Sequence, residues 1–597
     1  MTPRPLPTRN LDAATWGWLL LLACAVLIYT LGLGGQYNPS NGDELVYTHI
    51  ARLTAASGHW LPLVSDLDHM RNTKPPLLFW QALLATDWGH YWSLAALRAP
   101  SLIYTLLTAA ALAWSVQKIS GEVGRACLAA CIYLAFFSTF RYGRAYLTSA
   151  PETFWFSVPM FWMLWQRWRG AGTPLGWLTH IGFGLALGLG LAYKSFALIA
   201  PAGAALWCTQ WWTQQDRGWH ATAGTTLKVS LSALLALGLF ALWFALDPDP
   251  GAVWREFVIG ENAGKLSDSQ GYWHTALMGG GSSIWMQLLA YVQNAGLLAF
   301  VVIGLAWVGV TLCLRRSNQG ASATTHSPAG PLPILLIWLA VWLLVFTIPS
   351  QRSARYLIPA MPALAMLLAL YWQRIARAWF LLSLLLCSLF AGALGLIAWA
   401  ERGLRIGDDA EFAATVLAVL VTLALATSGL LRPAWTRACT LAACLAVYAC
   451  LGLATAPLNA AAGHYQAEVV AALDHARVAV PSSFNGQFER FEFLLPGNRF
   501  VPYDGERRSN ASPAEQAAEL KRLLALHDAV VWLQSSSAQS EPPCLPDCTL
   551  LGVRWEIQGR HQRGEINGNN FWTPQSWLFR REWLLASPAR RASAATR

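Results

Sequence analysis

The sequence predicts an all-α polytopic membrane domain that is followed by a small α/β domain. Of the 597 residues, 55% are hydrophobic and only 12% are charged, which is too apolar for an ordinary soluble protein. Apolar runs long enough to cross a bilayer recur through residues 1–456. From about Pro457 the content of charged and polar residues rises, and short strand patterns replace the long apolar runs.

The apolar runs indicate about thirteen transmembrane helices, because each approaches the roughly 20 residues that a bilayer crossing requires. Arg4 and Arg9 precede the first run and no small-residue cleavage site is evident, so this run is predicted to be a signal anchor. The predicted spans are 15–34, 93–116, 126–140, 152–166, 175–192, 196–213, 228–246, 284–314, 332–349, 356–372, 378–399, 411–431 and 437–456.

The basic residues set the predicted orientation. If the N-terminus is cytoplasmic, every cytoplasmic turn is basic, as the positive-inside rule requires. An odd number of spans then places residues 457–597 outside, together with the loops 35–92 and 247–283. The basic residues of these turns are Lys118 and Arg125, Arg167 and Arg169, Arg217 and Lys228, Arg315 and Arg316, Arg374 and Arg377, and Arg432 and Arg437.

The region 457–597 is predicted to be an outer α/β domain with a disordered tail from Ser587. Ser512-Pro513 is typical of a helix start, which predicts a helix over 513–527. Cys544 and Cys548 are predicted to form a short-loop disulfide in an oxidising compartment; the alternative, half of a metal site, lacks a second ligand pair. Strand patterns occur at 476–480, 529–534, 549–557 and 577–585.

The first outer loop carries charges beside the membrane. Asp43 and Glu44 follow the first span, where a carboxylate costs free energy unless it is solvated, paired or used. Lys74 precedes two prolines that fix it in an extended conformation, so it can either bind a phosphate or extend its ammonium to the membrane surface. Between them, Tyr47 to Ser57 is predicted to form a short amphipathic helix along the membrane surface.

Taken together, the motifs of this loop resemble one glycosyltransferase superfamily. They are Asp43-Glu44, Tyr47, Ile50-Ala51-Arg52, Ser57-Gly58 and Trp60, followed by Thr73-Lys74-Pro75-Pro76-Leu77-Leu78 and Trp80. The set is similar to the first periplasmic loop of the protein O-mannosyltransferases and the bacterial aminoarabinose transferases of lipid A. The resemblance implies the GT-C fold in the bacterial inner membrane. It also implies transfer of a sugar from a polyprenyl-phosphate donor to a lipid or protein acceptor on the periplasmic side.

Further segments extend the resemblance. A glycine-rich run ends at Lys194, as in the family, and an Arg-Tyr-Leu-x-Pro pattern begins at Arg355. The family usually has an Asp where this chain has Ser149, and the nearest acid is Glu152. We predict Asp43 as the base, with Glu44 orienting it or binding the incoming group. The predicted substrate-binding residues are Tyr47, Arg52, Lys74, Arg141, Arg144, Lys194, Lys265, Arg352, Arg355 and Tyr356.

Two departures leave the sugar and the acceptor open. Val46 stands where the family often has an Arg, and Thr73 stands where it often has an acid. The chemistry needs no cofactor, although a divalent metal is compatible with the carboxylates. An alternative function is a multispan lipid or solute transporter, which should show polar residues at mid-bilayer. Nucleic acid is not an expected partner, because the basic residues are dispersed between apolar runs.

Overall fold

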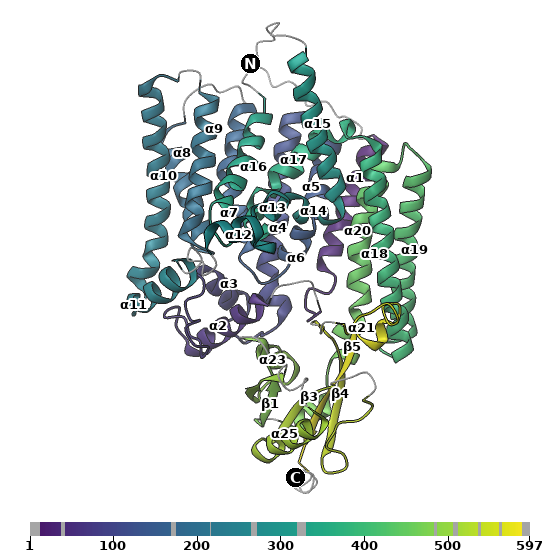
Figure 1. Ribbon diagram of the computed structural model, residues 1–597. Helices are drawn as coiled ribbons and strands as arrows, with labels where there is room; N and C mark the ends of the chain where they lie inside the picture. Colours follow the sequence, from purple (N-terminus) through teal and green to yellow (C-terminus); the bar gives the residue numbers. More distant parts are fainter. Residues whose placement is uncertain are drawn as a thin grey trace, which may run out of the picture.

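The computed structural model describes residues 12–37, 42–168, 175–214, 217–263, 271–318, 330–473, 475–482, 486–505, 512–534, 539–559, 561 and 564–587. Its long helices form a bundle, and a small sheet lies beyond one end of that bundle (Figure 1). We refer to the end of the bundle that carries the sheet as the sheet end.

A helix lies at each predicted apolar run. Within the described residues, 8 helical stretches are long and apolar enough to cross a membrane, and Val123–Ala135, Trp177–Leu191 and Leu332–Thr347 are shorter apolar helices. The helices of the bundle are α1 (Ala13–Thr30), α4 (Leu94–Ser120), α5 (Val123–Ala135), α7 (Ser149–Trp168), α8 (Trp177–Leu191), α9 (Ile199–Thr213), α10 (Trp219–Leu246), α14 (Ala290–Ala295), α15 (Ala299–Asn318), α16 (Leu332–Thr347), α17 (Met361–Tyr371), α18 (Arg377–Leu404), α19 (Asp409–Leu431) and α20 (Thr436–Ala454).

Local sequence explains where several of these helices begin and end. The Ser93 side chain accepts a hydrogen bond from the Ala96 N–H at the start of α4, and Gly121 ends that helix at φ 71°. Asp408 and Glu411 form a reciprocal capping box at the start of α19. Such caps satisfy backbone groups that a helix end leaves without partners.

The predicted loop 35–92 contains the helices α2 (Asp43–Ser57) and α3 (Leu77–Ala85). The helix predicted over Tyr47 to Ser57 is present as part of α2. Helix α2 packs against α3 and against η9 (Gln487–Arg490), a short 3-10 helix from the C-terminal region. Its polar side is therefore also covered, and Thr48 and His49 are fully buried.

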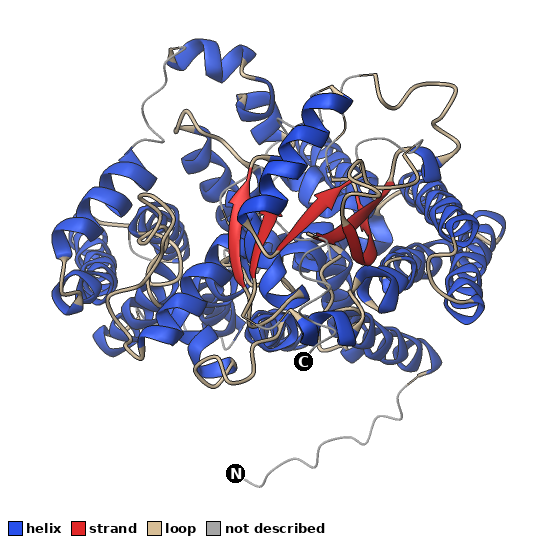
Figure 2. Cartoon of the chain, turned by 90° about the horizontal axis from the view of Figure 1, so that it is seen from below, coloured by secondary structure: helices blue, strands red, loops and turns tan. Residues whose placement is uncertain are grey.

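The sheet has five strands in the order β2-β1-β3-β5-β4, and Figure 2 shows it among the helices when the molecule is seen from below. Strands β1, β2 and β3 pair in parallel, whereas β5 is antiparallel to β3 and β4. The strands are β1 (Arg477–Pro481), β2 (Arg499–Tyr503), β3 (Ala529–Leu533), β4 (Thr549–Ile557) and β5 (Phe579–Ala586).

Four of these strands and the helix α25 (Pro513–Leu526) lie where the sequence predicts them. Strand β2 is not evident from the sequence, because it contains Pro502, which cannot donate a ladder hydrogen bond. The structure accommodates this proline because β2 is an edge strand. The predicted disordered tail lies outside the described residues, apart from Ser587.

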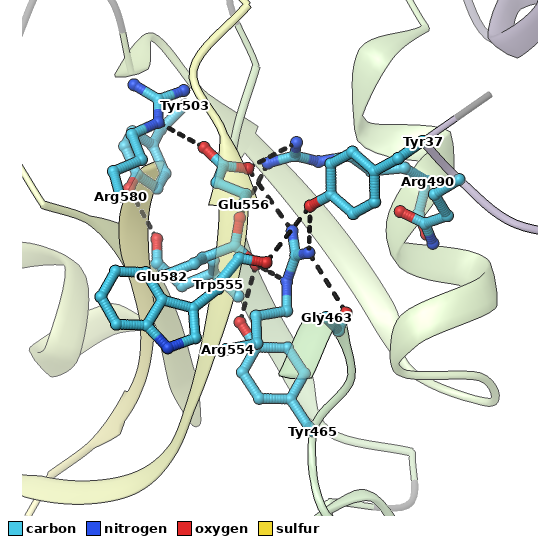
Figure 3. A network of polar contacts seen from close by, with 12 residues as sticks. Tyr37, Gly463, Tyr465, Arg490, Tyr503, Arg554, Trp555, Glu556, Arg580 and Glu582 are labelled. Carbon is cyan, nitrogen blue, oxygen red and sulfur yellow. Dashed lines mark hydrogen bonds and ion pairs between the residues drawn. The ribbon is translucent and has the colours of Figure 1, made fainter. Parts of the chain in front are cut away.

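A buried polar network attaches the sheet to the bundle (Figure 3). Arg554 is fully buried, binds Glu582 and donates a hydrogen bond to the Tyr37 hydroxyl at 3.2 Å. Arg490 bridges Glu556 at 2.9 Å and Glu582 at 2.8 Å. Tyr37 follows α1, so this network connects the sheet to the segment that leads into α2.

The same region of the chain also holds α2 directly. Glu489 precedes Arg490 in η9, and its carboxylate accepts hydrogen bonds from Arg52 Nε at 2.6 Å and Nη2 at 3.0 Å. The same carboxylate lies 2.8 Å from His49 Nδ1. Because Glu489 is fully buried, these contacts are shielded from water and fix α2 against the C-terminal region.

Candidate active site

Three ion pairs lie near one another at the sheet end of the bundle. Each pair joins segments that are far apart in the sequence. The nitrogen–oxygen distances are 3.1 Å for Arg355 with Asp43, 2.7 Å for Lys74 with Glu261, and 2.9 Å for Lys194 with Glu152. Three cations and three carboxylates in a partly buried site form an electrostatic environment that can bind and stabilise an anion.

Asp43 is the first residue of α2, and its side chain is 37% exposed. The partial positive charge at a helix N-terminus favours a carboxylate at this position. Its partner Arg355 lies in η6, a 3-10 helix that spans Ala354–Ala360, with the guanidinium 5.1 Å from the Tyr142 ring centroid. Asp43 is thus held in place while its carboxylate remains accessible to an acceptor.

Glu44 has a different environment from that of its neighbour. It is buried, and its two oxygens accept hydrogen bonds from Arg98 at 2.7 and 2.9 Å. Glu44 also accepts a hydrogen bond from the Tyr146 N–H at 2.8 Å, and Arg98 donates to the carbonyl of Leu33. The structure therefore places Glu44 as a positioning residue that fixes the start of α2, rather than as a group open to substrate.

A Glu44→Gln variant is expected to be less stable by about 3–5 kcal/mol, because it leaves the Arg98 guanidinium buried without its counter-ion. Thermal and chemical unfolding of the purified protein would measure the loss. Glu122→Gln is the matched control, because the exposed Glu122–Arg125 pair at 3.1 Å is expected to contribute at most about 1 kcal/mol. Equal unfolding midpoints for the two variants would contradict the role assigned to Glu44.

Lys74 is held from several sides. Its ammonium donates hydrogen bonds to the Thr73 carbonyl and to Glu261, both at 2.7 Å, and lies 5.6 Å from the Tyr47 ring centroid. Glu261 belongs to η2 (Trp254–Asn262), a π-helix in the loop 247–283. The loops 35–92 and 247–283 therefore meet at this lysine.

A second contact joins the same two loops. The Glu256 carboxylate accepts hydrogen bonds from the Asn72 backbone N–H at 3.0 Å and from its side-chain amide at 3.1 Å. These bonds fix the backbone two residues before Lys74. The position of its ammonium is consequently determined by both loops.

Lys194 lies in the segment between α8 and the next short helix. Its ammonium contacts the fully buried Glu152 of α7 and lies 5.6 Å from the Tyr356 ring centroid. Burial lowers the pKa of Lys194; Glu152 opposes this shift, whereas Arg355 and Lys74 lower the pKa further. An incoming anion would relieve this repulsion between cations.

Tyr47 is buried and lies close enough to all three pairs to feel their charges. Burial raises the pKa of the Tyr47 phenol well above its usual value, and the negative charges of Asp43, Glu261 and Glu152 raise it further. The phenol therefore keeps its proton at neutral pH. A neutral hydroxyl among these charges can donate a hydrogen bond to an anionic ligand.

Buried polar atoms near the pairs have free hydrogen-bonding capacity. Among the described residues, no partner reaches Oε2 of Glu152, Oγ of Ser149 or Oγ1 of Thr73. Ser149 and Glu152 lie on the first turn of α7, and Thr73 precedes Lys74. A buried polar atom without a partner is costly, so these three atoms are suited to contact a polar ligand.

Three of the remaining predicted binding residues contact groups outside the three pairs. Arg52 binds Glu489 and Glu492 of the C-terminal region. Buried Arg144 donates to the Leu31 carbonyl. Arg141 stacks near the Tyr142 ring at 5.1 Å. Lys265 lies outside the described residues.

Arg352 anchors the loop 247–283. Its buried guanidinium donates to the carbonyls of Thr347 at 2.8 Å and Ser282 at 3.1 Å, and to the Tyr272 hydroxyl at 3.1 Å. All three nitrogens of the Arg352 guanidinium thus donate hydrogen bonds to protein oxygens. Arg352 thus stabilises the loop beside the site, whereas Arg355 provides the guanidinium within it.

The sequence did not identify Glu152 and Glu261 as site residues. Glu152 has a signal in the sequence, since it is the acid nearest to the family's usual Asp position. Glu261 has none, because 187 positions separate it from Lys74. Glu261 meets Lys74 because the loops 35–92 and 247–283 pack against each other.

The structure bears on two further predicted features. A disulfide joins Cys544 and Cys548, which precede β4. Within the described parts of the chain, no group of three or more His, Cys, Asp or Glu side chains is placed to hold a metal ion.

The chain is similar in sequence and in fold to known proteins. Residues 15–250 match the family model of dolichyl-phosphate-mannose-protein mannosyltransferase. The crystal structure of ArnT from Cupriavidus metallidurans in the apo state superposes with a TM-score of 0.57 at 16% identity, over 87% of this chain and 93% of that chain. The chain is similar to the mannosyltransferase family over these residues and shares the fold of the ArnT structure.

The chain is also similar in sequence to two arabinosyl transferases. An undecaprenyl phosphate-alpha-4-amino-4-deoxy-L-arabinose arabinosyl transferase from Edwardsiella ictaluri is 28% identical over 368 residues, which are 60% of each chain. A second transferase of that name, from Sodalis glossinidius, is 28% identical over 68% of this chain and 69% of its own. The similarity to the Edwardsiella relative thus spans about three fifths of that protein's length.

A second ArnT crystal structure contains a lipid carrier. The Cupriavidus protein bound to undecaprenyl phosphate has a TM-score of 0.56 and 14% identity, over 96% of this chain and 98% of its own. At this identity the match establishes the shared fold. The ligand belongs to that protein.

Proposed function

We propose that this chain is a membrane glycosyltransferase that moves a sugar from a polyprenyl-phosphate carrier to an envelope acceptor. The cluster of three ion pairs is the observation that carries this proposal, because its cations match a phosphate and its exposed carboxylate matches a base. The fold shared with a protein that binds undecaprenyl phosphate supports the choice of donor. The acceptor is lipid A, another envelope glycan or a protein.

The reaction follows from an exchange of partners within the site. The donor phosphate, a monoanion, binds Arg355, Lys74 and Lys194 in competition with their carboxylates. Release of Asp43 from Arg355 frees its oxygen to accept the proton of the acceptor hydroxyl. The acceptor oxygen forms a bond to the anomeric carbon, while the bond from that carbon to the phosphate oxygen breaks.

Charge is balanced through this step. The polyprenyl phosphate leaves as a monoester that carries one more negative charge than the donor, and the proton resides on Asp43. The three cations stabilise the additional charge, which develops in the transition state. Inversion at the anomeric carbon follows from direct displacement, and the proposed mechanism needs no cofactor or metal ion.

The proposed topology follows the sequence. We place about thirteen spans in the bacterial inner membrane, with the N-terminus cytoplasmic and the loops 35–92 and 247–283 periplasmic. The transferase domain comprises residues 1–456, and residues 457–597 form a periplasmic domain. In this orientation the candidate site and the disulfide both lie on the periplasmic side.

Mass spectrometry of envelope lipids, glycans and proteins from cells with and without this chain tests the function. The expected result is a pentose-, amino-sugar- or hexose-sized addition that disappears when the chain is absent. Purified chain in liposomes should restore the addition when it is supplied with the polyprenyl-phosphate sugar and the acceptor. A carrier that crosses the bilayer chemically unchanged, with no transfer, would instead support the transporter.

A further inference from the structure

A cavity separate from the three ion pairs lies at the other side of the sheet end. Its volume is about 370 Å³, and it lies between the end of α18 and the start of α19, which Figure 1 shows in green. Pro457, which follows α20, also contributes to its wall. The residues that line this cavity include Glu401, Arg402, Arg405, Glu411 and Phe412.

Glu401 is the feature of this cavity that requires explanation. The residue is only 4% exposed, and among the described residues its Oε1 has no hydrogen-bond partner. Glu411 supplies a second carboxylate, whose Oε2 accepts the Asp408 N–H at 3.0 Å. A buried carboxylate oxygen without a donor is costly, so Glu401 is suited to bind a ligand that carries N–H groups and positive charge.

The same cavity contains cationic side chains. Arg402 pairs with the exposed Asp409 at 3.2 Å, and its guanidinium lies 4.6 Å from the Phe412 ring centroid. Arg405 is exposed and has a left-handed backbone conformation at φ 57°. Carboxylates and guanidinium groups around one cavity match a ligand that carries an ammonium group and a phosphate group.

The surroundings indicate a lipid. Trp399 is 65% exposed on α18 and its ring centroid lies 6.4 Å from that of Phe412. Farther from the sheet end than Trp399, exposed apolar side chains such as Leu389 and Leu417 continue along α18 and α19. Both helices are candidate membrane spans. A Trp at the border between an apolar helix surface and charged residues is typical of the level of lipid headgroups.

We propose that this cavity binds the headgroup of an ethanolamine phospholipid. The ammonium group donates hydrogen bonds to Glu401 and Glu411, the phosphate binds Arg402 and Arg405, and the acyl chains lie along α18 and α19. A choline headgroup lacks N–H donors, and a glycerol headgroup lacks the positive charge. Neither therefore offers the Glu401 carboxylate both a hydrogen-bond donor and a counter-charge. The site is independent of the proposed transferase activity.

Native mass spectrometry of the purified full chain tests this assignment with phosphatidylethanolamine, phosphatidylcholine and phosphatidylglycerol of identical acyl chains. We expect retention of the ethanolamine lipid to exceed that of the other two by about tenfold, the usual scale for one hydrogen bond to a charged group. Glu401→Gln should abolish this preference. Glu468→Gln, which changes an exposed carboxylate on α22 (Ala467–Ala472), should preserve it.

Two further measurements keep the test decisive. Ala398 is buried and lines the cavity, so Ala398→Met should fill the cavity and lower retention without a change of charge. Equal retention of all three lipids by the wild-type protein, or an unchanged preference in a folded Glu401→Gln variant, would overturn the site. Soluble glycerophosphoethanolamine that competes at the concentration of the lipid would overturn the assignment to a membrane lipid.

Discussion

An Asp43→Asn variant is expected to lose transfer activity by about a hundredfold or more, which is the usual contribution of a general base. The asparagine keeps the shape of the side chain but cannot accept the acceptor proton. Its amide also weakens the contact with Arg355, which the wild-type carboxylate binds at 3.1 Å. Initial rates with a polyprenyl-phosphate sugar and the acceptor would measure the loss.

Asp68→Asn is the matched control for this variant, because Asp68 is an exposed acid in the same outer loop. We expect this control to retain wild-type rates and both variants to unfold at similar temperatures. The loss in Asp43→Asn should be in turnover, because a freed Arg355 still binds the donor phosphate. Near wild-type turnover of a folded Asp43→Asn protein would remove Asp43 from the mechanism.

Replacement of Lys74 should weaken the use of the donor. Lys74→Gln removes a point charge that would bind the phosphate, and we expect the apparent donor affinity or turnover to fall by about 10- to 100-fold, the value of one or two charged hydrogen bonds. Lys74→Arg should lose only part of the activity, because the guanidinium is larger and prefers forked contacts. Donor titrations with both variants would separate these outcomes.

Lys118→Gln controls for the loss of a lysine, because Lys118 lies in the last turn of α4, away from the three ion pairs. It should show wild-type donor dependence. A lysine that merely reaches the membrane surface would tolerate arginine well and glutamine moderately, with effects on stability alone. Normal donor affinity and turnover in Lys74→Gln would leave the phosphate to Arg355 and Lys194.

The cations of the candidate site are paired in the absence of a ligand. Each cation that we assign to the donor phosphate is already bound to a carboxylate, so phosphate binding is an exchange of partners. Before the phosphate binds, pairing with carboxylates lowers the free-energy cost of holding three cations together in a partly buried site. The exchange also couples donor binding to the release of Asp43, which orders the two steps of the proposed reaction.

The sequence alone determined the positions of the helices, because an apolar run near 20 residues long has few alternatives to a membrane helix. It also determined four of the five strands and the start of α25, since local patterns and the Ser512 cap specify them. The sequence also allowed four site residues to be identified, for a related reason: Asp43, Lys74, Lys194 and Arg355. They lie in short polar motifs next to long apolar runs.

The tertiary structure decided which of the charged residues form the site. Asp43 and Glu44 are adjacent in the sequence, yet one is accessible and the other is buried against Arg98, because successive helix residues face different directions. Arg52 and Arg352 are used to hold Glu489 and Tyr272, whereas Glu152 and Glu261 join the site. A charge acquires its role from the partner that long-range packing brings within a few ångströms, and local sequence does not encode that distance.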